Sequence, residues 1–278
     1  MRRSASPRLL EVSTTNAAFQ HMETLLRNRH KRHRSGQFVV QGVRAINAAL
    51  AGGWAIKAFA FPRARQLSRW ATDILEASTA EQHFEVVPRL FETLSGKDDP
   101  SELIAIAATR PDALERIPVR AGMLVVVADR PASPGNLGTL IRSCDAFGVD
   151  GLIVTGHAVD LYDPATIRAS VGAFFSIPSV AAPSHRDVAD WLSRVRGTDP
   201  MLSVVGTTAR ATQPLRGLDA RGSIVIAVGN EATGLSHAYR EMCDTLVSIP
   251  MRGTATSLNA AVAASIALYE IDASRRRE

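Results

Sequence analysis

The chain is poor in cysteine, and its two cysteines, Cys144 and Cys243, lie far apart without the spacing of a metal site. A disulfide framework is therefore not expected, and a reduced cytoplasm is the simplest setting. No hydrophobic run approaches the roughly 18 residues that a membrane span requires. The charged start, MRRSASPRLLEV, is not followed by the apolar core of a signal peptide. We therefore expect a cytoplasmic protein with no membrane segment and no export signal.

Two common ligand-binding motifs are also missing. A dinucleotide-binding fold would carry G-x-G-x-x-G after its first strand, and the segment ASPGNLGTLIRS does not have that spacing. A P-loop would need G-x-x-x-x-G-K followed by Ser or Thr, and no such string occurs. No zinc-binding spacing is present either. Hydride transfer, phosphoryl transfer and a resident metal are therefore not favoured.

Positive charge is concentrated at one end of the chain. Residues 1–50 hold nine Arg and Lys against two acidic residues, a net charge of +7, whereas the whole chain carries +5. The segment RNRHKRHR supplies five fixed cations within eight positions: Arg27, Arg29, Lys31, Arg32 and Arg34. This density, without an acidic neighbour, favours contacts with the phosphates of a polyanion. The alternative interpretation is a solvated, partly disordered arm.

The pattern of apolar residues divides the 278-residue chain into two regions, and a hydrophobic content of 46% is ample for buried cores. A helix over 16–27 is followed by short strands and helices, which predicts a small α/β domain over 1–109. A segment with two prolines, mixed charge and no clear period predicts a linker over 110–121. A second, larger domain is predicted over 122–278.

The second domain begins with MLVVVADR, a continuous apolar strand of the kind that is buried on both faces. Further apolar strands alternate with helices from there to the end of the chain, which indicates a parallel sheet with helices on both faces. Ligands bind such sheets outside the carboxyl ends of the strands. The loops after VVVAD, SVVG, IAVG and VSIP are therefore the places where a site is expected.

Three of these loops carry unusual polar residues. The first holds Asn136, suited to capping a helix, and Arg142 within that helix. The second places Glu231 directly after a buried strand, where a charge is costly unless it is paired or solvated. The third brings Ser257 and Asn259 to the start of a helix. Each signal is weak alone, since a helix cap, a surface ion pair and a helix-terminal charge would explain them equally well.

Taken in order, the three loops resemble the signature of the SpoU (TrmH) group of SPOUT methyltransferases. The similar segments are NLGTLIRS at 136–143, VGNEATGLS at 228–236 and IPMRGTATSLNAAVAA at 249–264. ASVGAFFSIP resembles the middle segment of the group. KRHRSGQFVVQGVRAINAAL is similar to its accessory amino-terminal domain, although Gln41 stands where many relatives have Glu. The resemblance covers nearly all of 20–272.

The resemblance implies a fold and a cofactor. The fold would be α/β, with a carboxyl-terminal parallel-sheet SPOUT domain tied in a trefoil knot and a smaller amino-terminal domain like that of RNA-binding ribosomal proteins. The alanine-rich last helix would pack closely within the knot and against the partner of a homodimer. S-adenosylmethionine would be held mainly by main-chain groups and apolar contacts from five residues: Thr207, Gly229, Ile249, Met251 and Leu258.

The resemblance also assigns the chemistry, transfer of a methyl group to a ribose 2′-hydroxyl of RNA without a metal. Arg142 would lie nearest the reacting proton, although a guanidinium is normally protonated and has no acceptor. It would either be transiently deprotonated or position the RNA while phosphate or water takes the proton. Asn136 would orient Arg142 or the ribose, and Glu231 would hold the substrate or Arg142. Ser257 and Asn259 would complete the catalytic cluster.

The full accessory domain favours 23S ribosomal RNA as the substrate. Alanine- and arginine-rich composition agrees with a high-GC source, and we expect a relative of the enzymes that confer resistance to ribosome-targeting antibiotics, of the avilamycin-resistance type. The alternatives are a tRNA ribose methyltransferase, an RNA base methyltransferase of the same superfamily, and a non-catalytic RNA-binding relative. The presence of both N-x-G-x-x-x-R and S-L-N argues against the last two.

Overall fold

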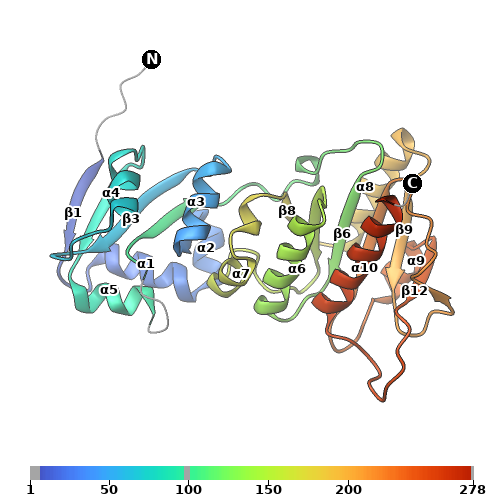
Figure 1. Cartoon of the computed structure of the whole chain (residues 1–278). Helices are drawn as coiled ribbons and strands as arrows, with labels where there is room; N and C mark the ends of the chain where they lie inside the picture. Colours follow the sequence, from blue (N-terminus) through green and yellow to red (C-terminus); the bar gives the residue numbers. More distant parts are fainter. Residues whose placement is uncertain (1–6, 97–100, 277–278) are drawn as a thin grey trace. The chain divides into compact units, whose positions relative to one another are not determined.

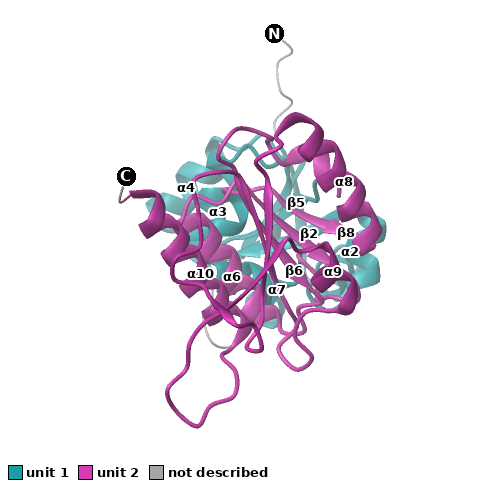
Figure 2. Ribbon diagram, turned by 90° about the vertical axis from the view of Figure 1, so that its right-hand side faces the viewer, with its two compact units in different colours: residues 1–110, 162–175 teal, residues 111–161, 176–278 magenta. Residues whose placement is uncertain are grey.

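The computed structural model describes residues 7–96 and 101–276, which form two compact units (Figure 2). Unit 1 contains the described residues up to Arg110 together with Tyr162–Phe175, and unit 2 contains Pro111–Leu161 and the described residues from Ser176 onward. The sequence predicts that 162–175 belongs to the catalytic domain, whereas the structure includes this segment in unit 1. In the described part of the chain, no helix is both long and apolar enough to cross a membrane.

Unit 1 is built on a five-stranded sheet with the order β1-β4-β3-β5-β2. Its strands are β1 (Arg8–Val12), β2 (Gln37–Gln41), β3 (Ile56–Pro62), β4 (Gln82–Val86) and β5 (Ile104–Ala108). The pairs β1–β4 and β4–β3 are parallel, whereas β5 runs antiparallel to both β3 and β2. The edge strand β1 was not expected from the sequence, because it is short and leaves Leu9 60% exposed.

The helices of unit 1 are α1 (Ala17–Arg27), α2 (Arg29–Ser35), α3 (Val43–Ala51), α4 (Arg69–Glu76), α5 (Pro88–Ser95) and α7 (Pro164–Ser170). The helix α1 buries Phe19, Met22 and Leu25, which the sequence placed on one helical face. These side chains pack with Val39 of β2 and with Phe91 of α5 in one apolar core. The accessory domain therefore has a core of its own.

The basic segment is not a disordered arm, because most of it forms α2. Asn28 caps this helix by accepting a hydrogen bond from the Lys31 N–H, and Gly36 ends it in the left-handed conformation (φ 62°). Arg32 points inward and is only 2% exposed. Its guanidinium donates to the Leu25 carbonyl at 2.9 Å and to the Asp163 carboxylate at 3.2 Å. The RNA-binding role predicted for Arg32 is therefore wrong, and this residue holds unit 1 together.

The segment Tyr162–Phe175 is packed into unit 1 by aromatic contacts. Phe38 of β2 lies 4.8 Å from the ring of Tyr162 and 6.1 Å from that of Phe174, measured between centroids. Trp54 donates a hydrogen bond to the Phe175 carbonyl at 3.3 Å. Deleting the amino-terminal part of unit 1 would leave these buried aromatic side chains without their partners. Substitutions of surface charge are therefore a cleaner probe of unit 1 than truncation.

Unit 2 contains a seven-stranded parallel sheet, as the sequence predicts, with the order β10-β12-β9-β11-β6-β7-β8. Its strands are β6 (Leu124–Asp129), β7 (Gly151–Thr155), β8 (Ser179–Ala182), β9 (Ser203–Thr207), β10 (Gln213–Pro214), β11 (Ile224–Val228) and β12 (Thr245–Ser248). The strands β6, β7 and β8 follow one another outward across one half of the sheet. The chain then crosses back, and β9 to β12 form the other half. The loops after β6, β9, β11 and β12 consequently meet at one edge of the sheet.

Helices cover both faces of this sheet (Figure 2). They are α6 (Pro134–Ala146), α8 (His185–Thr198), α9 (His237–Met242) and α10 (Ala260–Arg276). The helices α8 and α9 bury Trp191 and Tyr239 in the core on one face. On the other face α6 and α10 lie side by side (Figure 1), and the Ser143 and Ser265 hydroxyls are 2.7 Å apart. The buried alanines of α10 allow this close approach, as the sequence suggested.

A substitution at Asp163 tests the role of Arg32. Asp163 caps α7 through the Ala165 N–H and also accepts from Arg32, so Asp163→Asn keeps a capping oxygen but loses the ion pair. We expect the free energy of unfolding of unit 1 to fall by about 2 kcal/mol, as for a lost hydrogen bond to a charged group. Urea titration measures it. The control is Glu23→Gln, because the exposed pair with Arg27 is worth less than about 1 kcal/mol. Equal stability of both variants would contradict this role.

Candidate active site

A cavity of about 300 Å³ lies at the carboxyl ends of β9, β11 and β12. The five residues that the resemblance assigned to the cofactor all line it: Thr207, Gly229, Ile249, Met251 and Leu258. They come from three loops that are separated by about twenty residues or more in the sequence. The parallel topology explains their meeting, because the carboxyl ends of neighbouring strands share one edge.

Part of the cavity wall is apolar, and part of it is closely packed backbone. Val228, Leu235 and Val247 contribute apolar side chains to its lining. Gly229 admits no larger residue, because a Cβ there would lie 2.1 Å from the backbone nitrogen of Leu235 and 2.2 Å from the carbonyl carbon of Gly234. The chain is thus folded back tightly at this point, and main-chain groups rather than long side chains form this part of the wall.

Three of the five predicted catalytic residues form one hydrogen-bonded relay beside the cavity. The Asn259 side-chain amide donates to Oδ1 of Asn136 at 3.0 Å. The Asn136 amide in turn donates to Oε1 of Glu231 at 3.0 Å. The other carboxylate oxygen, Oε2, accepts from the backbone N–H of Ala132 at 3.1 Å. The relay therefore connects the loops that follow β6, β11 and β12.

The relay residues also sit at helix starts, although not as the sequence suggested for Asn136. Ser133 caps α6 by accepting from the Asn136 N–H, and Asn136 itself lies in the first turn. Asn259 caps α10 by accepting from the N–H groups of Ala261 and Val262. Pro134 fits the first position of α6 because a residue there needs no N–H donor, which explains why this helix begins earlier than expected.

The ionised form of Glu231 is favoured in this setting. Partial burial would raise the pKa of its carboxyl group, but hydrogen bonds from Asn136 and from the backbone of Glu231, Ala132 and Ser133 outweigh that effect. The net result is a pKa below the ordinary value for glutamate. The carboxylate lies at the amino-terminal, positive end of α6. It therefore interacts favourably with the dipole of α6 and not with that of α9, the helix that follows Glu231 in the sequence.

Arg142 and Ser257 lie outside the relay. Arg142 is exposed on α6, and no hydrogen bond or ion pair joins it to any residue that the structure describes. It follows Asn136 by six positions, which places it roughly 9 Å further along the helix and about 120° around it. Asn136 therefore does not contact Arg142 within one chain, and of the two roles expected for Asn136, orientation of the ribose remains a prediction. Ser257 is exposed and lines the cavity from the loop before α10.

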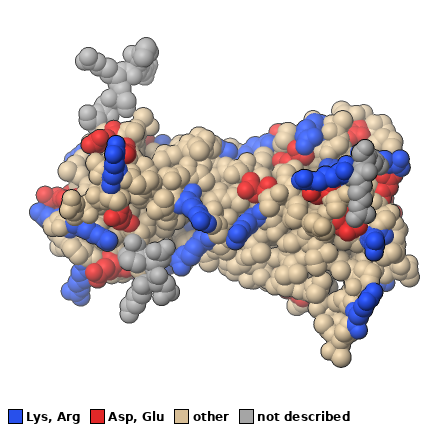
Figure 3. Space-filling model, in the orientation of Figure 1, with Lys and Arg blue, Asp and Glu red and all other residues tan. Residues whose placement is uncertain are grey.

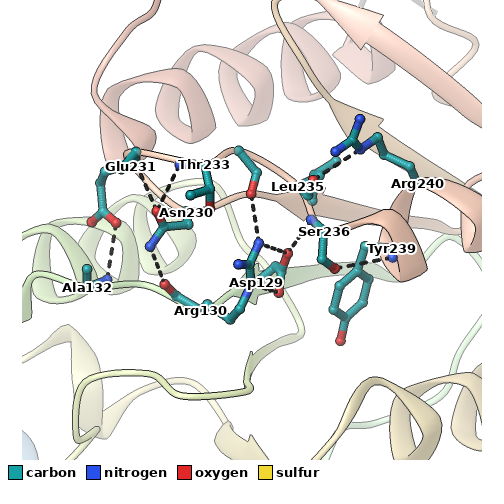
Figure 4. Close-up of polar contacts among 12 residues, drawn as sticks. Asp129, Arg130, Ala132, Asn230, Glu231, Thr233, Leu235, Ser236, Tyr239 and Arg240 are labelled. Atoms are coloured by element: carbon teal, nitrogen blue, oxygen red, sulfur yellow. Dashed lines mark hydrogen bonds and ion pairs between the residues drawn. The ribbon is translucent and has the colours of Figure 1, made fainter.

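Sequence reasoning missed three residues that fasten the loop after β11: Asp129, Arg130 and Asn230 (Figure 4). Asp129 is 3% exposed and forms an ion pair with Arg130, and the hydrogen bond to Asp129 raises the pKa of Arg130. A charged pair directly after the buried strand VVVA was the available signal. Among the described residues, no group of three or more side chains suited to binding a metal was found.

Two protein-family models match this chain. The SpoU rRNA methylase family matches residues 123–269, which is more than half of the chain. The SpoU L30e-like domain matches residues 16–105. These ranges correspond to the two regions that carry the resemblances in the sequence.

Curated and solved relatives agree with the family models. The 23S rRNA (uridine(2479)-2′-O)-methyltransferase of Streptomyces viridochromogenes is 43% identical over 266 residues, covering 95% of this chain and 92% of the relative. The crystal structure of the SpoU methyltransferase AviRb from that organism, in complex with AdoMet, has a TM-score of 0.90 and covers 94% of this chain and 98% of that one at 43% identity. An AdoMet-bound rRNA methyltransferase from Sinorhizobium meliloti is 30% identical with a TM-score of 0.84, covering 97% and 98%.

The variant Glu231→Gln tests the ionised relay. The carboxylate of Glu231 accepts hydrogen bonds from the Ala132 N–H and from the Asn136 amide. A glutamine has only one accepting oxygen, and its NH₂ group would face the other donor, so one hydrogen bond is lost. The pKa of Glu231 is lowered by folding, so its ionisation stabilises the protein above the unfolded pKa of about 4.3 and this contribution is lost as pH falls through the native pKa. We expect wild type to be more stable than the variant above about pH 5, with a difference that shrinks on acidification. Urea unfolding over a pH series measures this, and a difference that grows in acid would contradict it.

Proposed function

Because this chain belongs to the SpoU rRNA methylase family, we propose that it is an S-adenosylmethionine-dependent enzyme that methylates a ribose 2′-hydroxyl of 23S ribosomal RNA. The observation that carries the proposal is the relay from Asn259 through Asn136 to Glu231, because it joins all three motif loops beside one cavity. The curated relative that acts on 23S ribosomal RNA, with its similarity over nearly the whole chain, supports this substrate.

The cavity fits the cofactor in its chemistry. An adenine ring is flat and uncharged, so apolar walls and main-chain hydrogen-bonding groups suit it. Ile249 and Leu258 would supply apolar contacts, and the tight backbone at Gly229 would supply main-chain groups. Arg210 and Arg240 also line the cavity and would face the carboxylate of the methionine part. When bound, the cofactor supplies a methyl group on a positively charged sulfur.

The residues of the relay would align the target ribose. Glu231 is held in its ionised form and fixes the Asn136 amide, so these groups present a defined set of donors and acceptors before the substrate arrives. The reaction would form a bond between the 2′-oxygen and the methyl carbon while the bond from that carbon to the sulfur breaks, which leaves S-adenosylhomocysteine. The hydroxyl proton would pass to water or to an RNA phosphate. Ser257, exposed at the rim of the cavity, would contact the same ribose.

Arg142 would act on the RNA from the exposed face of α6. A guanidinium stays protonated in water and offers only donors, which favours holding a phosphate over accepting a proton. Its lack of a partner among the described residues leaves its donors available for that phosphate. We therefore favour positioning of the RNA over transient deprotonation as the role of Arg142.

Unit 1 would bind RNA through the exposed cations of the basic segment. Arg27 is 69% exposed at the end of α1, although it pairs with Glu23, and Arg29, Lys31 and Arg34 are exposed on α2. With Arg32 buried, these four remain from the predicted set of five. Their positive charge would be met by RNA phosphates with the release of counterions.

We also propose a homodimer that forms through α10. Val262, Ile266 and Tyr269 are 46%, 38% and 60% exposed, and their spacing places them on one face of this helix. Figure 3 shows that the surface over the first part of α10 and over α6 carries few charged side chains of the described residues. An apolar helical stripe beside a face with little charge suits a second copy of the chain. The trefoil knot of SPOUT enzymes is proposed for unit 2 on the family resemblance.

The biological role that we propose is protection of the ribosome in the cytoplasm. A 2′-O-methyl group removes a hydrogen-bond donor and adds bulk at one ribose, which would block a drug that contacts that nucleotide. Expression in a sensitive bacterium should raise the inhibitory concentration of an antibiotic that binds the modified site. Unchanged sensitivity, with the methyl group present on the RNA, would point instead to a housekeeping modification.

The function itself is tested by methylation of RNA with purified protein. Labelled S-adenosylmethionine, 23S ribosomal RNA and a tRNA pool are incubated with the enzyme, and the product is mapped by mass spectrometry. We expect one 2′-O-methylated nucleotide in 23S ribosomal RNA and none in a substrate with a 2′-deoxy nucleotide at that position. Methylation of the deoxy substrate, or of tRNA alone, would overturn the proposed reaction or the proposed substrate.

Substitution of Arg142 separates chemistry from cofactor binding. Arg142 does not line the cavity, so Arg142→Ala should retain cofactor affinity by calorimetry. Its single-turnover methylation with saturating RNA should fall on the order of a hundredfold or more, as for loss of one aligned charged group. Arg142→Lys should be nearly as impaired, because an ammonium group cannot reproduce the planar fork. Loss of cofactor binding, or a near-normal rate, would show that the catalytic assignment is mistaken.

Neutralising the exposed cations of α2 should weaken RNA binding. In the triple variant Arg29→Gln, Lys31→Gln, Arg34→Gln we expect lower affinity and a slope of log affinity against log salt that is smaller by roughly two to three units. Fluorescence anisotropy across a salt series measures both. The control variant, Arg63→Gln with Arg69→Gln, removes exposed cations of unit 1 that pair with acidic residues. An effect of the control in proportion to its two lost charges, about two thirds of that of the triple variant, would show that only net charge matters.

A charge within the apolar stripe tests the homodimer. Ile266 lies in its middle, so Ile266→Asp should place a carboxylate in the interface and yield a monomer in sedimentation equilibrium. The control is Ser193→Asp, which adds the same charge at an exposed position of α8. Wild type and control should have the mass of two chains. A variant that stays dimeric would place the interface elsewhere.

A further inference from the structure

The loop Gly229–Ser236 forms one wall of the cavity and carries Glu231. It is closed on itself by two backbone hydrogen bonds between Asn230 and Gly234, at 3.1 and 2.9 Å. The loop therefore contains a compact turn whose two ends are joined to each other. The position of its wall, and of the Glu231 carboxylate, depends on what fastens this turn to the rest of unit 2.

The end of β6 provides that fastening, chiefly through Arg130 (Figure 4). The Arg130 guanidinium donates to both oxygens of Asp129, at 3.0 and 3.1 Å, and also to the Gly234 carbonyl at 3.1 Å. The Arg130 carbonyl accepts from the Asn230 side chain at 2.8 Å. Asp129 accepts from the backbone N–H of Ser236 at 2.7 Å. These bonds hold the two paired ends of the turn, Asn230 and Gly234, and the residue at its exit, Ser236, while Glu231 near the tip is also held by Asn136 and Ala132.

The backbone of Arg130 is adapted to this task. Its φ of 55° lies in the left-handed region, which residues other than glycine rarely adopt. Gly156 makes room for its side chain, because a Cβ at that position would lie 2.7 Å from Cγ of Arg130. Backbone strain of this kind persists only where surrounding contacts hold it, and here both the carbonyl and the guanidinium of the strained residue contact the turn.

We propose that Arg130 is a positioning residue for methyl transfer, which sets the cavity wall around Gly229 and the place of Glu231 through its hold on Gly234 and Asn230. This inference rests on the proposed function. Arg130 does not line the cavity, so it acts through the turn and not by touching the cofactor. Arginine is required because its planar fork binds the Asp129 carboxylate and a second acceptor together. Lysine would neutralise Asp129 without spanning both acceptors.

The test compares Arg130→Lys and Arg130→Ala with wild type. The control Arg194→Ala removes an exposed arginine of the same unit, which pairs with Glu115. Calorimetry gives the affinity for S-adenosylhomocysteine, thermal melting gives stability, and hydrogen exchange reports the amides of 229–236. We expect Arg130→Lys to melt close to wild type, to bind S-adenosylhomocysteine about tenfold or more weakly, and to exchange faster in this turn. Ethylguanidine should restore part of the affinity of Arg130→Ala.

The outcomes separate this inference from the proposed function. If wild type and control bind S-adenosylhomocysteine and Arg130→Lys binds equally well, the fastening has no effect on the cavity and the inference is overturned. A lower melting temperature of Arg130→Lys with unchanged affinity would assign Arg130 a purely structural role and would also overturn it. If wild type itself fails to bind S-adenosylhomocysteine, the proposed function falls, and the inference with it.

Discussion

The side-chain amide of Asn136 satisfies its two neighbours in only one orientation, and the candidate active site depends on this constraint. Glu231 accepts hydrogen bonds only, so the Asn136 nitrogen must face it and the oxygen must face Asn259. Asn259 also begins α10, and Glu231 lies at the start of α6. One amide group therefore connects three loops and two helix ends. The geometry of the site thus depends on the fold that brings these loops together.

The parallel sheet explains why this coupling arises at one edge. The strands β6, β11 and β12 end on the same side, and each is followed by one part of the relay or of the cavity. The apolar part of the cavity wall would suit an uncharged adenine ring, whereas the exposed cations of α2 in unit 1 would suit a polyanion. In the proposed function, cofactor binding would therefore belong to unit 2, and the cations of unit 1 would add to the RNA contacts of unit 2.

The sequence predicted the parallel sheet, its edge and the loops of the site, because continuous apolar strands and the order of three motifs depend on local residue types. It did not predict the burial of Arg32, since the partner Asp163 lies far away in the sequence and arginines are usually exposed. It also did not place Tyr162–Phe175 in unit 1, because aromatic contacts with Phe38 and Trp54 are non-local. The backbone strain at Arg130 could not be predicted either, since no residue pattern indicates a positive φ at an arginine.

The most direct test of the central claim is the variant Asn136→Asp, which changes one nitrogen to oxygen with nearly the same shape. A second carboxylate would then face Glu231, so the relay would be broken by repulsion between like charges. The measurement is single-turnover methylation of 23S ribosomal RNA together with calorimetry of S-adenosylhomocysteine binding. The account predicts retained cofactor affinity and a rate lower by roughly a hundredfold or more. A variant that methylates at the wild-type rate would contradict the view that this relay builds the active site.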